Sequence, residues 1–141
     1  MRVLLVDDFE PIRRSVCSIL QQRPNFQVIG QAGNGMEAVE KAEELQPDVI
    51  LLDISLPKLN GIDAARRILK LSPKSKIIFL SQNGSPWMVE GALSMGANGY
   101  LLKMDAGEEL FEAIEAVIQG GQFVSRTLRR EVKVRHGGAS A

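Results

Sequence analysis

The stretch Asp48-Val49-Ile50-Leu51-Leu52-Asp53 decides the fold of this chain. An apolar run without alternation, set between two carboxylates, predicts a strand buried on both faces, as in a parallel sheet covered by helices on either side. Asp53 then lies where this strand ends, and open α/β sheets bind ligands at the carboxyl ends of their strands. Asp53 is therefore a candidate for chemistry. A helix cap or turn is the alternative role, but Asn60 is better placed to cap the next helix.

Strands and helices are expected to alternate along the rest of the chain. Apolar residues at helical spacing follow each of five apolar runs, which predict strands at 3–6, 26–32, 48–53, 76–80 and 98–102. Strict alternation implies right-handed crossovers between parallel strands. We therefore expect an α/β fold with one doubly wound, five-stranded parallel sheet in the order 2-1-3-4-5 and five helices.

Length and charge suggest one domain followed by a basic tail. The chain has 141 residues, 45% of them apolar, which is enough for one core. Residues 1–121 hold 12 Lys and Arg against 16 Asp and Glu, whereas residues 122–141 hold five against one. Because nucleic-acid binding depends on basic residues, the acidic domain is not expected to bind DNA. We expect residues 122–141 to be flexible or to extend the last helix.

The sequence also gives expectations about compartment. The single cysteine, Cys17, lies among apolar residues at helical spacing and predicts a buried, reduced thiol rather than a disulfide or a nucleophile. The first apolar run is too short for a signal peptide, and no stretch has the length of a membrane span. We therefore expect a cytoplasmic protein without a membrane partner.

Polar side chains end four of the five predicted strands. Asp7 and Asp8 follow the first strand, Asp53 ends the third, and Ser81 and Lys103 end the fourth and fifth. Three carboxylates in one crevice raise one another's pKa unless a cation lies among them, and oxygen ligands suit Mg²⁺. A lysine and a hydroxyl can hold phosphoryl oxygens. The set predicts phosphoryl transfer to Asp53, with Asp7 and Asp8 left for the metal.

These residues, together with Pro57, Gly61 and the run Gly99-Tyr100-Leu101-Leu102-Lys103, resemble the receiver domain of bacterial two-component response regulators over residues 1–121. The run 99–103 is similar to that of NarL-type receivers. The resemblance implies a flavodoxin-like, CheY-like fold and a role in phosphorelay signal transduction. It implies that a sensor histidine kinase or a phosphotransfer protein phosphorylates Asp53. It also implies that the protein is no turnover enzyme, although it catalyses its own phosphorylation and dephosphorylation.

The resemblance also implies residue roles. Mg²⁺, or Mn²⁺, would be bound by Asp7, Asp8, Asp53 and the main-chain carbonyl of Ser55, with Asp7 acting through water. Lys103 and Ser81 would hold the phosphoryl group, and Ser81 with Tyr100 would form the switch. The lifetime of the phosphoryl group would depend on three residues that flank the approach of water: Ser55, Gln82 and Asn83. Two positions depart from the usual pattern, since Gln82 replaces a small residue and Met104 a proline.

In this interpretation, the Tyr100 ring swings from solvent into the space that Ser81 leaves. We expect a homodimer through the fourth helix, fifth strand and fifth helix, or a separate output protein, because the tail is too short for an output domain.

Three other interpretations remain open from the sequence. Residues 33–38 fit the dinucleotide fingerprint G-x-G-x-x-A, although this turn follows an expected edge strand and leaves Asp7, Asp8, Ser81 and Lys103 unexplained. The carboxylates and the lysine would also suit a metal-dependent hydrolase with an aspartyl nucleophile. A docking module that works without phosphorylation is the third.

Overall fold

The computed structural model describes residues 1–131, in which strands and helices alternate as the sequence predicts. The elements, in chain order, are β1 (Arg2–Val6), α1 (Glu10–Leu20), β2 (Gln27–Ala32), α2 (Gly35–Leu45), β3 (Val49–Asp53), α3 (Gly61–Leu71), β4 (Lys76–Ser81), α4 (Pro86–Ser94), β5 (Gly99–Leu102), the 3₁₀ turn η1 (Lys103–Asp105), α5 (Ala106–Ile118), β6 (Phe123–Val124) and the 3₁₀ helix η2 (Arg126–Glu131).

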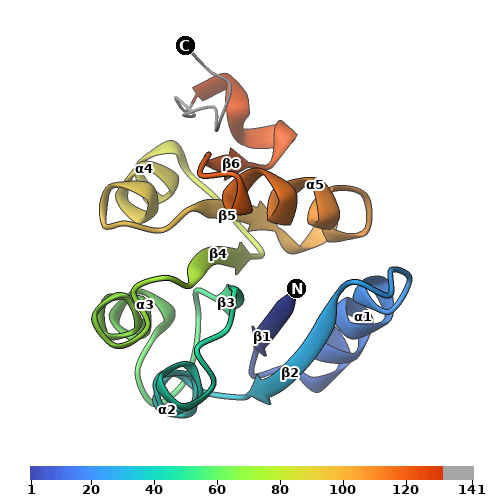
Figure 1. The fold of residues 1–141 in the computed structure, drawn as a ribbon. Helices are drawn as coiled ribbons and strands as arrows, with labels where there is room; N and C mark the ends of the chain where they lie inside the picture. The colour runs from blue at the N-terminus through green and yellow to red at the C-terminus, as the bar shows by residue number, and fades with distance from the viewer. Residues whose placement is uncertain (132–141) are drawn as a thin grey trace.

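The strands form one parallel sheet in the order β2-β1-β3-β4-β5-β6. The predicted order of the first five strands is confirmed. Helices α2, α3 and α4 cover one face of the sheet and α1 and α5 the other (Figure 1). The chain order reverses between β1 and β3, so the crevice beyond these two strands is where a doubly wound sheet binds its ligand.

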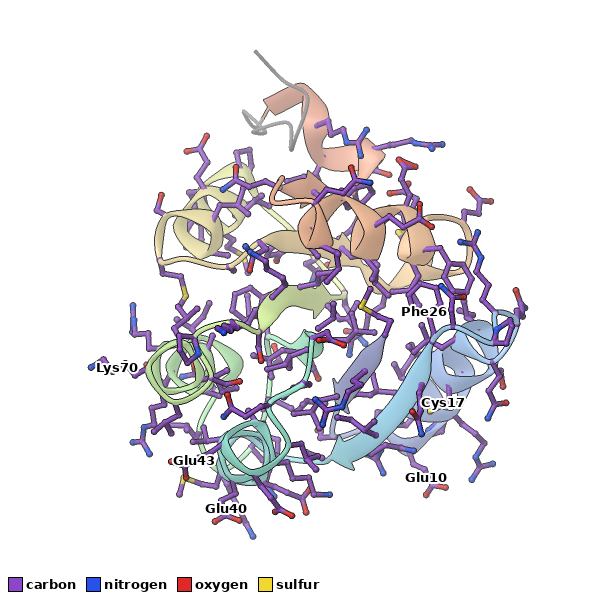
Figure 2. All side chains as sticks on the ribbon, in the orientation of Figure 1. Glu10, Cys17, Phe26, Glu40, Glu43 and Lys70 are labelled. Carbon is purple, nitrogen blue, oxygen red and sulfur yellow. The ribbon has the colours of Figure 1, made fainter. Side chains whose placement is uncertain are left out.

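The central strand β3 is buried on both faces, because its successive side chains enter two different apolar clusters. Ile50 and Leu52 pack under α2, α3 and α4, whereas Val49 and Leu51 pack under α1 and α5. Each such side chain contributes roughly 1.5–3 kcal/mol when it leaves water. The outer helix faces are polar, and Figure 2 shows Glu40, Glu43 and Lys70 projecting outward from α2 and α3.

The predicted N-cap at Asn60 is confirmed, and Ser85 caps α4 in the same way. Asn60 accepts a hydrogen bond from Asp63 N at 3.0 Å, and Ser85 accepts one from Met88 N at 3.4 Å. Asp105 and Glu108 have the spacing of a capping box, but they do not form one. Asp105 has helical backbone angles and ends the η1 turn, whereas an N-cap needs an extended backbone. Its carboxylate instead accepts a hydrogen bond from Thr127 Oγ1 at 3.3 Å.

The expectation of a five-stranded sheet is wrong, because a sixth strand pairs with β5. Phe123 and Val124 lie opposite Gly99 and Tyr100 and are 2% and 0% exposed. The turn at Gly120 (φ +93°) brings the chain back to the sheet after α5, where the edge of β5 offers unpaired backbone groups and Phe123 and Val124 become buried.

The sixth strand changes the interpretation of the C-terminal segment. Helix α5 ends at Ile118 and is not extended, and residues 123–131 form β6 and η2. The remainder of the expected tail, residues 132–141, lies outside the described residues. The homodimer face expected through the fourth helix, fifth strand and fifth helix is covered at β5 by β6. Within residues 1–131 no helix is long and apolar enough to cross a membrane.

Candidate functional site

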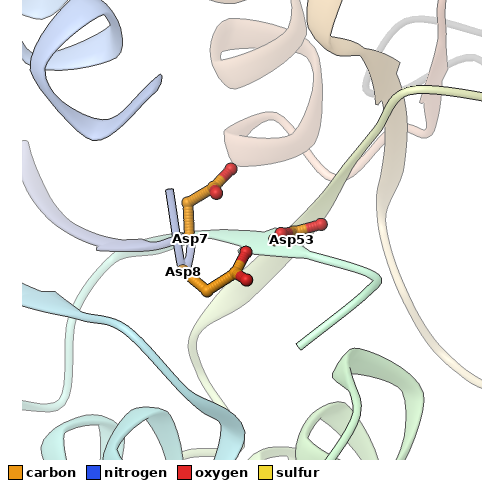
Figure 3. A group of neighbouring side chains, drawn as sticks. All are labelled: Asp7, Asp8 and Asp53. Carbon is orange, nitrogen blue, oxygen red and sulfur yellow. The ribbon is translucent and has the colours of Figure 1, made fainter. Parts of the chain in front are cut away.

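Three carboxylates meet at the carboxyl ends of two neighbouring strands. Asp7 and Asp8 follow β1, and Asp53 ends β3, as Figure 3 shows. One carboxylate oxygen from each residue lies within 4.8 Å of the others. Asp7 is fully buried and Asp53 is 3% exposed, whereas Asp8 is exposed. The sequence prediction that these three acids share one crevice is confirmed.

Local hydrogen bonds fix how the two buried carboxylates point. Asp7 Oδ1 accepts from Phe9 N at 2.9 Å, and Asp53 Oδ1 accepts from Ser55 N at 3.0 Å. Each is a side-chain turn of the kind that Asp forms with the backbone two residues on. The guanidinium of Arg13 donates to the main-chain carbonyl of Asp7 at 2.5 Å and so holds the end of β1. The Oδ2 atoms of both acids are therefore left for other partners.

Lys103 lies against both of these oxygens. Its Nζ is 2.7 Å from Asp7 Oδ2 and 3.3 Å from Asp53 Oδ2. Asp7 Oδ2 is buried and makes this ion pair, but it has no hydrogen bond of acceptable geometry. A buried carboxylate oxygen without a hydrogen bond, beside two further acids, fits a hard divalent cation such as Mg²⁺, which prefers oxygen ligands.

The charges of the cluster shift the pKa values within it. The pKa of Asp53 is raised from 3.8 to about 6, mainly by burial; the charge of Asp7 also raises it, whereas the Ser55 amide and Lys103 partly offset both effects. Burial alone would lower the pKa of Lys103, but its close contact with the Asp7 carboxylate and the charges of Asp53 and Asp7 outweigh this and raise the pKa. Lys103 therefore carries a positive charge at neutral pH.

A pocket of about 440 Å³ opens above the cluster. Its walls come from the loops that follow β1, β3, β4 and β5, so it gathers most of the residues that the sequence singled out. The pocket is lined by Asp8, Phe9, Ile12, Asp53, Ile54, Ser55, Ser81, Gln82, Asn83, Met88 and Lys103. Asp7 is buried below these residues and does not line the pocket itself, but it pairs with Lys103, which does.

Comparison with known proteins identifies the family of this chain. The family model of the response regulator receiver domain matches residues 3–115. This chain belongs to that family. The receiver is 38% identical over 124 residues to the transcriptional regulatory protein DegU of Brevibacillus brevis, covering 88% of this chain and 52% of DegU. It is 40% identical over 116 residues to the chemotaxis protein CheY of Thermotoga maritima, covering 82% of this chain and 96% of CheY.

A solved structure supports the fold of the receiver. The crystal structure of a LuxR-family two-component response regulator from Aurantimonas sp. SI85-9A1 superposes with a TM-score of 0.87 at 30% identity, covering 92% of this chain and 93% of that one. The chain spans about half the length of DegU, so what DegU does as a whole protein is not carried over to it.

Family membership leaves the other interpretations unfavoured, and the receiver's structure shows why the glycine motif misled. The first backbone N–H groups of α2 donate to the β3–α3 loop, Gly35 N to Pro57 O at 3.2 Å and Met36 N to Lys58 O at 3.1 Å. A Cβ on Gly35 would lie 1.8 Å from the carbonyl oxygen of Leu59. The glycine therefore permits close packing of a loop, and the N–H groups that a dinucleotide phosphate would need are occupied.

Ser81 and Tyr100 of the receiver are joined through one backbone carbonyl. Ser81 Oγ donates to Asn83 O at 2.5 Å, and the Tyr100 hydroxyl donates to the same oxygen at 2.7 Å. Tyr100 is fully buried, and burial raises the pKa of its phenol. The expectation that this ring lies in solvent is wrong for the present structure, because Gly84 and Leu128 pack beside it.

Sequence reasoning missed Leu128 and the Asn83 carbonyl. The apolar residues Phe123, Val124 and Leu128 within the basic C-terminal segment were a signal that this segment packs on the domain. A backbone carbonyl leaves no such signal.

Proposed function

We propose that Asp53 accepts one phosphoryl group from a phosphohistidine of a sensor kinase or phosphotransfer protein. A carboxylate oxygen of Asp53 attacks phosphorus, the phosphorus–nitrogen bond breaks, and its electron pair stays with the imidazole. The observation that carries the proposal is the position of Asp53, at the end of the central strand and on the wall of the pocket, with Lys103 Nζ at 3.3 Å. With a pKa of about 6, Asp53 is mostly ionised at neutral pH and can act as the nucleophile.

The residues present fit a divalent cation, Mg²⁺ or Mn²⁺. Asp8, Asp53 and the main-chain carbonyl of Ser55 would hold it directly, and Asp7 through a water, because Lys103 already lies at Asp7 Oδ2. When bound, the cation supplies positive charge between the carboxylates and the phosphoryl oxygens.

Lys103 and Ser81 would hold the transferred group. Lys103 already faces Asp53 and can bind a phosphoryl oxygen with little movement, since its Nζ lies between two carboxylates. Ser81 first has to release the carbonyl of Asn83 and turn toward the phosphoryl group. Ser55, Gln82 and Asn83 line the pocket and would control how water approaches the phosphorus and so how long the group persists.

Phosphorylation would act as a signal rather than as turnover. The receiver would catalyse only the gain and loss of its own phosphoryl group, and an output element, in a separate protein or a further domain, would read the change. Because β6 covers β5, a second copy or an output protein would meet the outer surfaces of α4, η2 and α5 rather than β5 itself.

The test is phosphorylation by a small acyl phosphate, acetyl phosphate, in Mg²⁺. We expect intact-protein mass spectrometry to find one added phosphoryl group, lost with a chelator or with Asp53→Asn. Asp48→Asn is the matched control, because Asp48 precedes the same strand at its opposite end. Modification that persists in Asp53→Asn would contradict the assignment.

A further inference from the structure

Residues 123–131 form the strand β6 and the helix η2, and we call them the strap. The strap lies beside Tyr100, the proposed switch residue, on the side of β5 away from β4. Figure 1 shows β6 beside β5, with η2 following beyond it. No residue of the strap belongs to the proposed phosphorylation site, and the family model ends at residue 115, before the strap begins.

The strap is hydrogen-bonded to β5 on both sides of Tyr100. Phe123 N donates to Asn98 O at 3.0 Å, and Ser125 N donates to the carbonyl of Tyr100 at 3.0 Å. The buried hydroxyl of Ser125 also accepts from Leu102 N at 2.7 Å. The backbone of Tyr100 is thus held between β4 and the strap.

The strap is also attached to α5 by charged groups. Glu109 is 4% exposed, and its Oε1 accepts a hydrogen bond from Arg126 N at 3.2 Å. The Arg126 side chain pairs with Glu112 at 2.7 Å. A buried carboxylate is unfavourable without such a partner, so Glu109 favours the docked strap.

Leu128 of the strap closes the side of the Tyr100 ring. A Cβ built on Gly84 would lie 2.8 Å from Leu128 Cδ1 and 3.1 Å from Tyr100 Cε1, so these three residues are in close packing. Leu128 packs on the same apolar cluster that contains Tyr100. Leu128 therefore contributes to the burial of the Tyr100 ring, which is 0% exposed.

The shared carbonyl of Asn83 connects this packing to the phosphoryl site. Ser81 and Tyr100 both donate to it, at 2.5 and 2.7 Å. When Ser81 turns toward a phosphoryl oxygen, the carbonyl keeps a partner only if Tyr100 remains buried. Leaving a carbonyl without a partner is unfavourable, so a buried Tyr100 makes the release of Ser81 easier.

We propose that the strap, through Leu128, holds Tyr100 in its buried position. The buried Tyr100 then keeps the carbonyl of Asn83 hydrogen-bonded, which makes it easier for Ser81 to leave that carbonyl and turn toward the phosphoryl group. Strap docking and phosphorylation of Asp53 then stabilise each other, because coupling between two sites is reciprocal. The inference goes beyond the proposed function but rests on it for the phosphorylated state.

The experiment measures both directions of the coupling in the full chain. The first measurement is the affinity for beryllofluoride, a phosphoryl mimic that binds a carboxylate, followed by NMR titration with Mg²⁺ present. We expect Leu128→Ala to weaken binding about five- to tenfold. Leu69→Ala is the matched control, since Leu69 is a partly buried leucine of the same cluster that packs on Gly96. It should destabilise the fold to a similar degree but leave the affinity unchanged.

The second measurement is amide hydrogen exchange of Leu102 and Ser125. Beryllofluoride should slow it several-fold in the parent chain. Without beryllofluoride, Gly84→Ala should accelerate it, because the new methyl would press on Leu128, whereas Gly91→Ala, which has open space, should not.

The outcomes separate the two proposals. If beryllofluoride fails to bind the parent, or binds Asp53→Asn equally well, the proposed function fails, whereas the comparison of Gly84→Ala with Gly91→Ala still tests the strap. If beryllofluoride binds at Asp53 but exchange is unchanged and Leu128→Ala behaves like Leu69→Ala, the strap is only structural and the inference is overturned.

Discussion

The ammonium group of Lys103 lies closer to Asp7 than to Asp53, at 2.7 Å against 3.3 Å. This pair is almost enclosed, with side-chain exposures of 12% for Lys103 and 0% for Asp7. Lys103 therefore neutralises a buried acid. Under the proposed function it would also face a phosphoryl group once a divalent cation shares the charge of Asp7. The stability of the metal-free domain should depend on this pair.

Lys103→Met should lower the free energy of unfolding by about 3–5 kcal/mol in the presence of a chelator, because it leaves Asp7 buried without a cation. Mg²⁺ should restore part of the loss. Urea denaturation with and without Mg²⁺ measures both effects. In an Asp7→Asn background the same substitution should be much milder; an equal loss in both backgrounds would show that the pair is not the cause.

Asp53 should make the metal-free protein less stable as the pH rises from about 4 to about 6. Its pKa is about 6 in the folded state, mainly because of burial, against 3.8 in the unfolded chain. Between these values the folded state binds more protons than the unfolded chain, so the free energy of unfolding falls with rising pH. Asp53→Asn removes this dependence and should be more stable than the parent at pH 7 by roughly 1–3 kcal/mol.

Chemical denaturation at pH 4, 5, 6 and 7 with a chelator checks this difference. A constant difference between parent and Asp53→Asn across the window would contradict the raised pKa.

The sequence predicted those parts of the molecule that follow from local pattern. Continuous apolar runs marked β1, β3 and β4, and strict alternation with helices ordered the strands, so Asp7, Asp8 and Asp53 could be placed together. The strand β6 has only two residues, too few to give a periodic signal, and a basic segment follows it.

The rest depends on contacts between distant segments. The position of Tyr100 depends on Gly84 and Leu128. Asp105 does not cap α5, because it ends the η1 turn and its carboxylate accepts a hydrogen bond from Thr127. Such contacts leave no local pattern, so the order of the strands could be predicted and the buried position of Tyr100 could not.

Gln82→Ala should shorten the lifetime of the phosphoryl group on Asp53 several-fold. Gln82 is exposed on the wall of the pocket, and removing its side chain opens the approach of water to the phosphorus. Loss of the acyl phosphate over time, followed by intact-protein mass spectrometry after removal of the donor, measures the rate. Gln22→Ala, at an exposed position after α1, is the control. A decay rate equal to that of the parent would show that Gln82 does not shield the site.

Gly61→Ala should disturb the site from the α3 end of the β3–α3 loop. A Cβ at this position would lie 2.4 Å from the main-chain oxygen of Asp53 and 2.7 Å from Ile54 Cα, so the end of β3 must shift. Both neighbours are backbone atoms, which cannot turn aside as a flexible side chain can. The displaced Asp53 would no longer meet Asp7 and Asp8 in the same geometry. We expect a loss of about 2–3 kcal/mol in stability and a weaker affinity for Mg²⁺.

Gly107→Ala separates this effect from the general consequences of replacing a helical glycine. Gly107 lies in the first turn of α5 with no heavy atom near its missing Cβ, so alanine there should stabilise the protein by about 0.5–1 kcal/mol and leave Mg²⁺ binding unchanged. Urea denaturation and a Mg²⁺ titration followed by NMR measure both variants. If Gly61→Ala binds Mg²⁺ as tightly as Gly107→Ala, contact between α3 and the Asp53 carbonyl does not set the geometry of the carboxylate cluster.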